Sequence, residues 1–467
     1  MTAVVNARHD PFLTGAFAPV AVERDDANLV VTGRLPDALA GMYLRNGPNP
    51  MFEPKGRYHI FDGDGMLHGL TLDGEGNASY RNRWIRTAGL AVEARAGRAI
   101  YGGMANGDFP SPEERDGGPG IKNVANTNVV RHAGRILALW EAGLPTEVSP
   151  ALETIGEYDF AGSYVGPFSA HPKFDPATGE MLTFGYSAIP PYLRYHVVDA
   201  SGRLTRTVEI DLPAPVMIHD FAITDQHVVF FDAPAVFDFS SFASGGPMLT
   251  WKPENGTRIG VMPRAGSGSD IIWVETDPCY VFHFLNAFTA ADGTVVVDAC
   301  RLPRMDIGLE AASGSGEADP WLHRFTVDVS ARTARYEQIA ELPGDFPRVP
   351  AAMEGREHRY GYYATFSSGR PGAGDFDSVT KVDLASGAAT THRYGDDVIA
   401  GEAVFAADPG GGSGEDDGWL LNFVTDRATL TSEFVVLDAG TLDEVARVHL
   451  PHRVPFGFHG NWLPTSV

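Results

Sequence analysis

The amino-acid sequence predicts an all-β protein whose small sheets are arranged as a β-propeller. The 467 residues include 53 glycines and 33 prolines, which suit turns and sheet edges better than helices. Apolar runs are short and rich in Val, Ile, Phe, Tyr and Trp, as in strands. Hairpin signals recur along most of the chain without a long stretch of helical periodicity. Radial sheet repeats therefore fit better than one sandwich.

The expected hairpin turns combine an acidic residue with a glycine. The acidic side chain accepts hydrogen bonds from the backbone that follows it, and glycine permits a positive φ angle. Such turns are predicted at residues 72–74, 175–179, 199–202, 292–293 and 383–387.

Segments between these turns show the period-two alternation of strands. The plainest predicted strands are residues 182–186, 228–231, 295–298 and 420–424. Two segments rich in Gly, Pro and acidic residues, 106–120 and 409–418, are predicted to be surface loops rather than domain linkers. We therefore expect a single domain over residues 1–467. No strict repeat along the chain sets the number of blades.

The charge of the chain excludes one class of partner. Its 36 basic and 60 acidic side chains give a formal net charge of −24, whereas binding to phosphate backbones needs clustered Lys and Arg. We expect no nucleic-acid partner. Cys279 and Cys300 lie in apolar runs and are predicted to be reduced and structural. Residues 1–30 have no apolar run of signal-peptide length, and no segment is long enough to span a membrane, which predicts a cytoplasmic protein.

Four of the fifteen histidines stand out because apolar or small residues flank them at strand-like positions. They are His171, His219, His283 and His459. Each alone is more typical of a hydrogen-bonded core histidine, and their spacing matches no short metal-binding motif. In a propeller, however, the innermost strands of different blades line one axis and bring distant residues together.

Sequence blocks along nearly the whole chain carry a further signal. They are GMYLRNGPNP (41–50), FDGDGM (61–66), ANTN (125–128), WEAG (140–143), FPRV (346–349), HRYGY (358–362), GEA (401–403) and FHGNW (458–462). With these blocks and the histidine segments in this order, the chain resembles the carotenoid cleavage oxygenase family. That family also includes retinal-forming, apocarotenoid-cleaving and stilbene-cleaving enzymes.

The resemblance implies a seven-bladed β-propeller with a helical and loop dome over one face. It also implies a non-haem Fe(II) bound by His171, His219, His283 and His459, with O₂ as co-substrate. Four neutral imidazoles supply no anionic ligand, which favours Fe(II) over Fe(III). The implied reaction splits a conjugated C=C bond into two carbonyl products and requires no general base.

Three outer acids are implied as hydrogen-bond partners of the histidine ligands, namely Glu141, Asp345 and Glu402. Such partners set the imidazole tautomer and raise its basicity. Which acid pairs with which histidine stays open. The family usually has Glu where this chain has Asp345, so a longer, water-bridged or backbone-shifted contact is expected there.

Aromatic walls suit a long apolar substrate held over the metal. The candidate substrate contacts are Phe61, Trp140, Phe284, Phe288 and Phe458, with ordinary propeller core as the alternative for each. In stilbene-cleaving relatives a lysine and a tyrosine hold the phenolic oxygen, and these positions look like Trp140 and Met104. Since neither side chain can bind a phenolate, we expect a carotenoid or apocarotenoid substrate.

Two apolar segments, 88–92 and 237–251, are candidates for a weak and reversible hydrophobic membrane contact, which would make the protein peripheral to a membrane. The alternative is that they cover the core of the dome. Two other functions stay open, namely cleavage of a stilbene or phenylpropene by the same chemistry, and a non-catalytic propeller used for binding.

Overall fold

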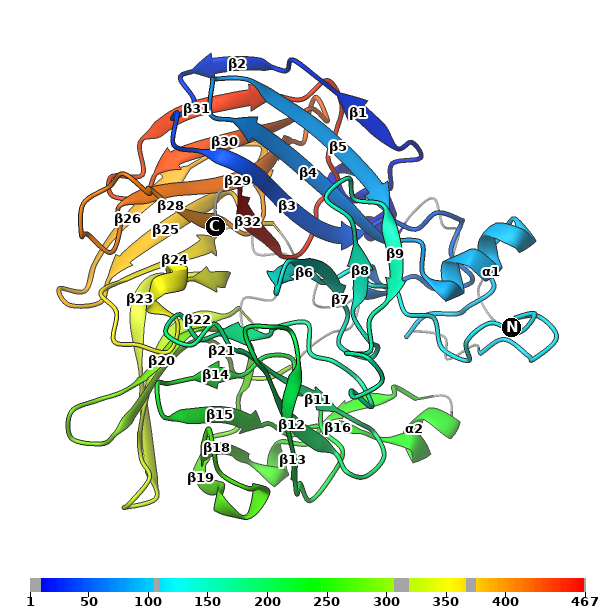
Figure 1. Ribbon diagram of the computed structural model, residues 1–467. Coiled ribbons are helices and arrows are strands. Elements are labelled where there is room, and N and C mark those ends of the chain that lie inside the picture. Colours follow the sequence, from blue (N-terminus) through cyan, green and yellow to red (C-terminus); the bar gives the residue numbers. More distant parts are fainter. Residues whose placement is uncertain (1–9, 105–108, 245, 306–318, 367–374, 466–467) are drawn as a thin grey trace.

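A computed structural model describes residues 10–104, 109–244, 246–305, 319–366 and 375–465. Regular structure in these ranges is mostly β-strand, and neighbouring strands pair in antiparallel fashion. Figure 1 shows the sheets arranged around a common centre, with β6 and β32 close to it. This arrangement confirms an all-β, propeller-type fold.

Four sheets are built from strands in residues 24–276, and the first of them also includes the C-terminal strand β32. The first joins β1 (Arg24–Asp26), β5 (Ala78–Trp84), β4 (Gly65–Asp73), β3 (Ala40–Pro48) and β32 (Gly460–Pro464). The second joins β6 (Asn128–His132), β7 (Arg135–Leu139), β8 (Thr146–Val148) and β9 (Thr154–Glu157). The third joins β10 (Lys173–Phe174), β11 (Met181–Tyr186), β12 (Leu193–Val198) and β13 (Leu204–Ile210). The fourth joins β14 (Ala222–Ile223), β15 (His227–Asp232), β18 (Thr257–Pro263) and β19 (Ile272–Thr276).

Two longer strand paths and one small hairpin complete the fold. One path runs through β20 (Tyr280–Thr289), β21 (Val295–Leu302), β22 (Trp321–Asp328), β23 (Thr333–Arg348), β24 (Tyr360–Thr365), β25 (Ser378–Asp383) and β26 (Ala388–Arg393). The other runs through β2 (Val30–Gly33), β31 (Glu444–His449), β30 (Ser432–Asp438), β29 (Gly418–Asp426) and β27 (Val398–Ala400), with β28 (Val404–Ala407) also paired to β29. The hairpin consists of β16 (Ala235–Phe237) and β17 (Leu249–Trp251).

The two ends of the chain close the ring of sheets. Near the N-terminus, β2 pairs with β31 in a sheet built from late strands, whereas the C-terminal β32 pairs with β3 in a sheet built from early strands. Each terminal strand thus covers a sheet edge that would otherwise expose unpaired backbone groups.

Helices are few and lie outside the sheets. In the described residues the α-helices are α1 (Ala88–Ala96) and α2 (Phe239–Ala243), and both lie on the right of Figure 1. The Thr87 side chain caps α1 at its start, and Gly97 ends it with φ +66°. Leu90 and Val92 of α1 are buried. Among residues the structure describes, no helix is long and apolar enough to cross a membrane.

The local predictions agree with these elements. All five predicted turns connect paired strands, for example β4 to β5 after Asp73 and β25 to β26 after Asp383. The four predicted strands lie within β11, β15, β21 and β29. Residues 109–120 and 409–417 of the two predicted loops contain no strand or helix, whereas the last residue predicted as loop, Gly418, begins β29. Residues 106–108 of the first loop lie outside the described residues. Cys279 and Cys300 are buried and free, as predicted.

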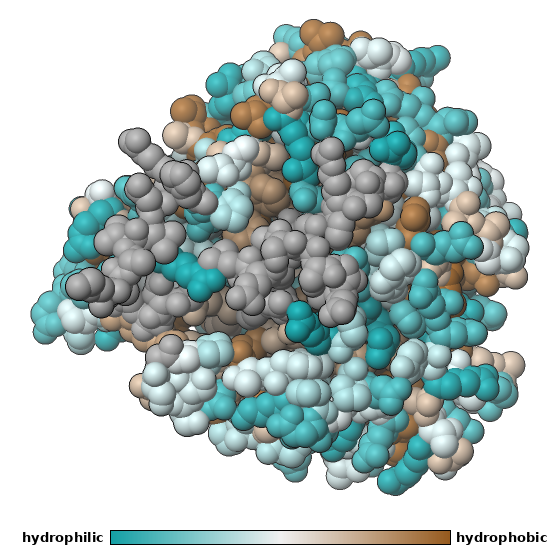
Figure 2. Space-filling model, turned by 180° about the vertical axis from the view of Figure 1, so that it is seen from behind, coloured by the Kyte–Doolittle hydropathy of each residue, from teal (hydrophilic) through white to brown (hydrophobic). Residues whose placement is uncertain are grey.

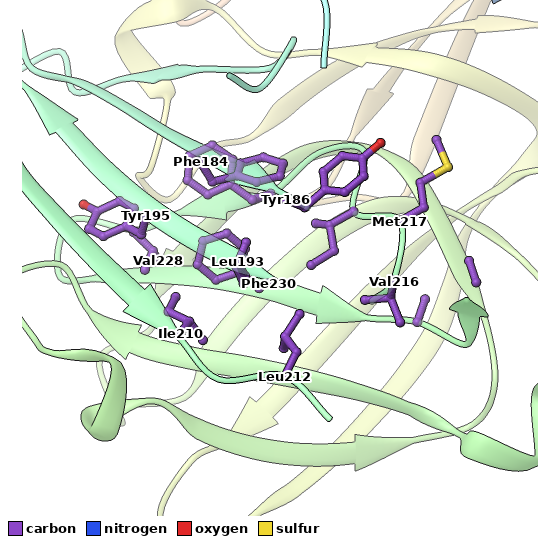
Figure 3. Close-up of a cluster of buried hydrophobic side chains, with 14 of the residues drawn as sticks. Phe184, Tyr186, Leu193, Tyr195, Ile210, Leu212, Val216, Met217, Val228 and Phe230 are labelled. Carbon is purple, nitrogen blue, oxygen red and sulfur yellow. The ribbon is translucent and has the colours of Figure 1, made fainter. Parts of the chain in front are cut away.

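The largest buried cluster lies between the sheet of β10–β13 and the sheet of β14–β19. Figure 3 shows Phe184 and Phe230 inside this cluster, with Tyr186 and Met217 at one end of it. On the face shown in Figure 2, hydrophobic residues are scattered among hydrophilic ones, which is consistent with the high net charge.

Candidate metal centre and substrate cavity

The structure brings the four singled-out histidines together at the centre of the ring. Three of the histidines lie just before a strand: His171 before β10, His219 before β14 and His459 before β32. The fourth, His283, lies within β20. One nitrogen atom from each imidazole lies within 4.8 Å of the other three, and all four residues are buried.

The spacing of these nitrogens fits a metal ion. The Nε2 atoms of His171 and His219 are 3.0 Å apart, and those of His283 and His459 are 3.2 Å apart. Two metal–imidazole bonds of about 2.1 Å at a right angle would place their nitrogens about 3.0 Å apart. The ring planes of neighbouring histidines are steeply inclined, at 61° to 84°. The donor set therefore fits a divalent transition metal that accepts imidazole ligands.

Burial keeps part of this set in the form that binds metals, which is the neutral imidazole. Burial, together with the neighbouring histidines, lowers the pKa of His171 well below its usual value. Burial also lowers the pKa of His459 to about 4, despite the nearby Glu402 carboxylate. For His219, burial acts in the same direction, but the charge and the hydrogen bond of Glu141 outweigh it and raise its pKa.

Each of the three predicted acids contacts a different histidine. Glu141 Oε2 lies 2.6 Å from His219 Nδ1, Asp345 Oδ1 lies 2.9 Å from His283 Nδ1, and Glu402 Oε1 lies 3.0 Å from His459 Nδ1. A carboxylate at Nδ1 holds the proton there and leaves the Nε2 lone pair for a metal. Among the described residues, no acid lies within hydrogen-bonding distance of the fourth histidine, His171.

The contact of Asp345 is direct, so no bridging water is needed to span the missing methylene. The backbone is irregular at this point, where the β23–β24 register shifts between Asp345 and Arg348. Phe346 has φ +54°, and its N–H group donates to the same Oδ1 atom at 2.9 Å. The direct 2.9 Å contact excludes the water-bridged geometry expected for the shorter acid, and a backbone shift relative to family members with Glu stays a prediction.

The other histidine segments are held by backbone contacts from the ANTN and GMYLRNGPNP blocks. Asn128 Nδ2 donates to the carbonyl oxygen of Ala170, next to His171, at 2.8 Å. The backbone N–H of Asn46 donates to the carbonyl oxygen of His459 at 2.9 Å. A Cβ atom on Gly47 would lie 2.7 Å from the Cα atom of Gly457, so glycine permits this close approach.

Among the residues that sequence reasoning missed, Tyr186, Asp220 and Lys173 support this centre. The Tyr186 hydroxyl donates to Glu141 Oε1 at 2.8 Å. The Asp220 carboxylate accepts the backbone N–H of Phe284 at 3.0 Å and contacts Lys173 Nζ at 3.0 Å, so it connects three histidine segments. Its position directly after His219 was the available signal for Asp220, whereas Tyr186 lies in a plain strand.

A cavity of about 490 Å³ lies next to Glu141, the outer acid of His219, although none of the four histidines is among its lining residues. Its lining is mostly apolar and includes Phe61, Met104, Trp140, Tyr186 and Phe237. Glu141 also lines it, so the cavity reaches the acid that contacts His219. Three of the predicted substrate contacts, Phe61, Trp140 and Met104, therefore lie on the cavity wall.

The other three predicted contacts do not line this cavity. Phe284 packs against Phe231 in the core, because neighbouring strand residues point to opposite faces and His283 takes the central face. Phe288 is buried beside His358, far along the same strand. Phe458 packs edge-on against Phe61, with ring centroids 5.7 Å apart, behind the cavity wall.

Two aromatic rings that were not singled out adjoin the histidines. Phe346 lies 5.2 Å from the ring of His283 and 5.0 Å from that of His459, measured between centroids. Phe282 lies 5.4 Å from the ring of His219. These rings add apolar surface next to the imidazoles.

The two apolar segments proposed for membrane contact differ. In segment 88–92 the large side chains Leu90 and Val92 are buried, so this segment covers the core of its own region. In segment 237–251, Phe237, Phe239, Met248 and Leu249 line the cavity. Phe239 is 49% exposed at its edge.

Comparisons with known proteins agree with this site. A family model described as retinal pigment epithelial membrane protein matches residues 17–464. The chain is 35% identical to the carotenoid cleavage oxygenase of Mycobacterium tuberculosis over 100% of both chains. It is 34% identical to carotenoid 9,10(9',10')-cleavage dioxygenase 1 of Arabidopsis thaliana, covering 98% of this chain and 91% of the relative.

Solved structures show the same similarity. The lignostilbene dioxygenase of Pseudomonas brassicacearum matches with a TM-score of 0.90 and 29% identity, over 98% of this chain and 99% of that one. Cobalt-substituted Synechocystis apocarotenoid oxygenase matches with a TM-score of 0.85 and 30% identity, over 96% and 97%. The relatives named here are oxygenases and dioxygenases, which supports an oxidoreductase activity. With the family model and these full-length similarities, the chain belongs to the carotenoid cleavage oxygenase family.

Proposed function

We propose that the protein is an Fe(II)-dependent dioxygenase that cleaves a conjugated C=C bond of a carotenoid or apocarotenoid. The observation that carries the proposal is the buried four-histidine cluster beside an apolar cavity that reaches Glu141, the partner of His219. Fe(II) held there would supply the activation of O₂, whose two oxygen atoms end in the two carbonyl products. His171, His219, His283 and His459 would be its ligands.

The outer acids have a defined task in this proposal. Glu141, Asp345 and Glu402 hold the Nδ1 protons of three ligands, which keeps each Nε2 atom directed at the centre. No other side chain needs to transfer a proton, since the reaction releases none.

The cavity would hold a polyene with one double bond near the metal and would exclude water from it. Trp140 and Met104 offer an indole and a thioether to such a chain, and Phe61 adds an aromatic face. A buried phenolic oxygen without a partner would cost about 1 to 3 kcal/mol. An apolar wall at these positions therefore favours a polyene over a hydroxystilbene.

A second candidate is cleavage of a stilbene or phenylpropene, which the similarity to a lignostilbene dioxygenase supports. The same ligands and outer acids would serve it, and only the cavity wall would differ. A non-catalytic binding propeller is a third candidate, but it offers no reason for three histidine–carboxylate pairs around one point.

The experiment that tests the proposal combines metal analysis with a substrate screen. We expect about one iron per chain after anaerobic loading and cleavage of an apocarotenal faster than that of resveratrol. His283→Ala should abolish both iron retention and O₂-dependent cleavage, because it removes one of four ligands. His358→Ala, at a buried histidine outside the cluster, is the matched control.

Three outcomes contradict parts of the proposal. Full iron content and turnover in the His283→Ala variant would exclude the four-histidine site. Faster cleavage of resveratrol by the unmodified protein would favour the stilbene candidate. A wild-type protein that binds no metal would favour the binding propeller.

We also propose that the fold has seven blades in one domain over residues 1–467. The two halves of the long strand β23 pair with different strands, β22 and β24. If each half belongs to its own blade, the seven-stranded path forms two adjacent blades, which supports this number. The helices α1 and α2 and the β16–β17 hairpin would form the dome. Weak hydrophobic membrane contact would involve the edge of the cavity near Phe239.

A further inference from the structure

The FPRV block contributes a charged side chain to the centre that the ligand set does not explain. Arg348 lies three residues after Asp345, and it forms a two-pronged ion pair with Glu402. Arg348 Nε lies 2.8 Å from Glu402 Oε1, and Nη2 lies 2.9 Å from Oε2. Glu402 is 2% exposed, whereas Arg348 is 28% exposed. Arg348 thus reaches a proposed ligand, His459, only through Glu402.

The other two outer acids have no such cation. The second donor to Glu141 is the neutral hydroxyl of Tyr186, and the second donor to Asp345 is the backbone N–H of Phe346. Within the described residues neither acid forms an ion pair with Lys or Arg. The charge of Glu402 alone is therefore cancelled.

The remaining charges near the centre do not change this balance. Lys173 and Asp220 form their own ion pair at 3.0 Å and cancel each other. Glu354 lies farther out, near Lys173, Asp220 and Arg348, and burial raises its pKa. Among the described residues it forms no hydrogen bond with any of the four histidines, and it is common to all variants considered below.

We infer that Arg348 is a positioning residue that matches the charge of the centre to a divalent ion. Three carboxylates against one guanidinium leave two net negative charges beside the four neutral imidazoles. A divalent ion makes this buried assembly neutral, whereas a trivalent ion leaves it charged, which is costly away from water. This inference rests on the proposed metal site and adds a residue that selects the charge of the ion.

Arg348 also has a geometric role, so its charge must be tested separately. Its Nη2 atom donates to the carbonyl oxygen of Gly460 at 2.8 Å, and Glu402 Oε2 accepts the N–H of Gly460 at 2.9 Å. Arg348→Gln removes the charge and most of these contacts, whereas Arg348→Lys keeps the charge but loses the two-pronged geometry.

The test measures the affinities of metal-free protein for Co(II) and Ga(III), two ions of different charge, by competition with a chelator. A unit charge roughly 10 Å from the ion, at an effective dielectric constant of about 20, changes the affinity for a trivalent ion relative to that for a divalent ion roughly tenfold. We expect Arg348→Gln to raise the ratio of Ga(III) to Co(II) affinity roughly tenfold. Arg348→Lys should keep the wild-type ratio.

Two further variants make the result independent of folding defects. Glu402→Gln should lower the ratio roughly tenfold, opposite in sign to Arg348→Gln, and the double variant should restore it. Arg324→Gln is the matched control, because Arg324 forms an equally buried two-pronged pair with Asp298 outside the centre. It should lower the unfolding temperature and leave the ratio unchanged.

The outcomes separate this inference from the proposed function. An unchanged ratio in both Arg348→Gln and Glu402→Gln overturns it, and so does a ratio in Arg348→Lys equal to that in Arg348→Gln. Opposite shifts in the two single variants support it. If the wild-type protein bound neither ion, the proposed metal site itself would be wrong, and the inference would fall with it.

Discussion

The hydroxyl of Tyr186 offers a sharp test of how the cavity wall supports the metal centre. Tyr186 is buried, lines the cavity and donates to Glu141 Oε1, while Glu141 Oε2 contacts His219. Tyr186→Phe removes one oxygen atom and keeps the ring, which packs against Phe237 with centroids 6.1 Å apart. Glu141 would then keep only its contact with His219 and could turn toward the cavity.

The expected loss follows from the kind of hydrogen bond that is removed. A hydrogen bond to an ionised acceptor contributes about 1.5 to 3 kcal/mol. Substitutions in the outer partners of metal ligands commonly lower metal affinity about 10 to 100-fold. Because Tyr186 acts through Glu141, we expect the lower end, about tenfold for Co(II), measured by chelator competition.

A matched control separates this effect from ordinary destabilisation. Tyr362 is also buried, and its hydroxyl donates to the carbonyl oxygen of Ala439 at 3.0 Å, away from the centre. Tyr362→Phe should lower the unfolding temperature without changing the metal affinity. Equal metal affinity in Tyr186→Phe and the wild-type protein, despite a similar loss of stability, would refute the reasoning.

Three further predictions concern the acid at His283, the cavity wall and acid stability. Asp345→Asn should lower metal affinity and turnover about 10 to 100-fold while the unfolding temperature changes little, and wild-type iron content would remove Asp345 from the site. Trp140→Lys should slow apocarotenal cleavage relative to resveratrol cleavage, since it places a cation in the apolar wall; an unchanged ratio of the two rates would contradict this. Burial lowers the pKa of His196 from 6.5 to about 3, so between these pH values only the unfolded chain takes up the proton, and the stability of the fold falls as the pH decreases below 6.5. The histidine accounts for about 2 kcal/mol of the stability lost between pH 6.5 and pH 5, and His196→Phe should remove this part of the loss. Identical unfolding curves for both proteins at the two pH values would contradict this.

The turns, the strands and the four histidines were accessible from the sequence for different reasons. A turn such as the one after Asp73 depends on local hydrogen bonds, so a few residues specify it. The four histidines stand out by their apolar flanks, but their grouping into one metal site required the resemblance, because nothing local relates His171 to His459. The pairing of acids with histidines depends on how separate sheets pack, and no sequence spacing encodes that.

The positions of predicted substrate contacts away from the cavity have a local physical cause. Phe284 follows His283 in β20, and residues that follow one another in a strand face opposite sides. A side chain next to a centrally directed histidine is therefore expected in the core, as Phe284 is. The shifts in β20–β21 register at Val281, Phe284 and Asn286 further prevent simple alternation from predicting the position of Phe288.

The three outer acids face different surroundings, and this gives the centre two unlike sides. Glu141 is 15% exposed, lines the cavity and is held by the neutral Tyr186 hydroxyl. Glu402 is 2% exposed and is held by the charge of Arg348. The cavity is therefore lined by the partner of His219 but not by that of His459. We expect changes in the cavity wall to affect the centre through His219, while the charge of the centre depends on the opposite side.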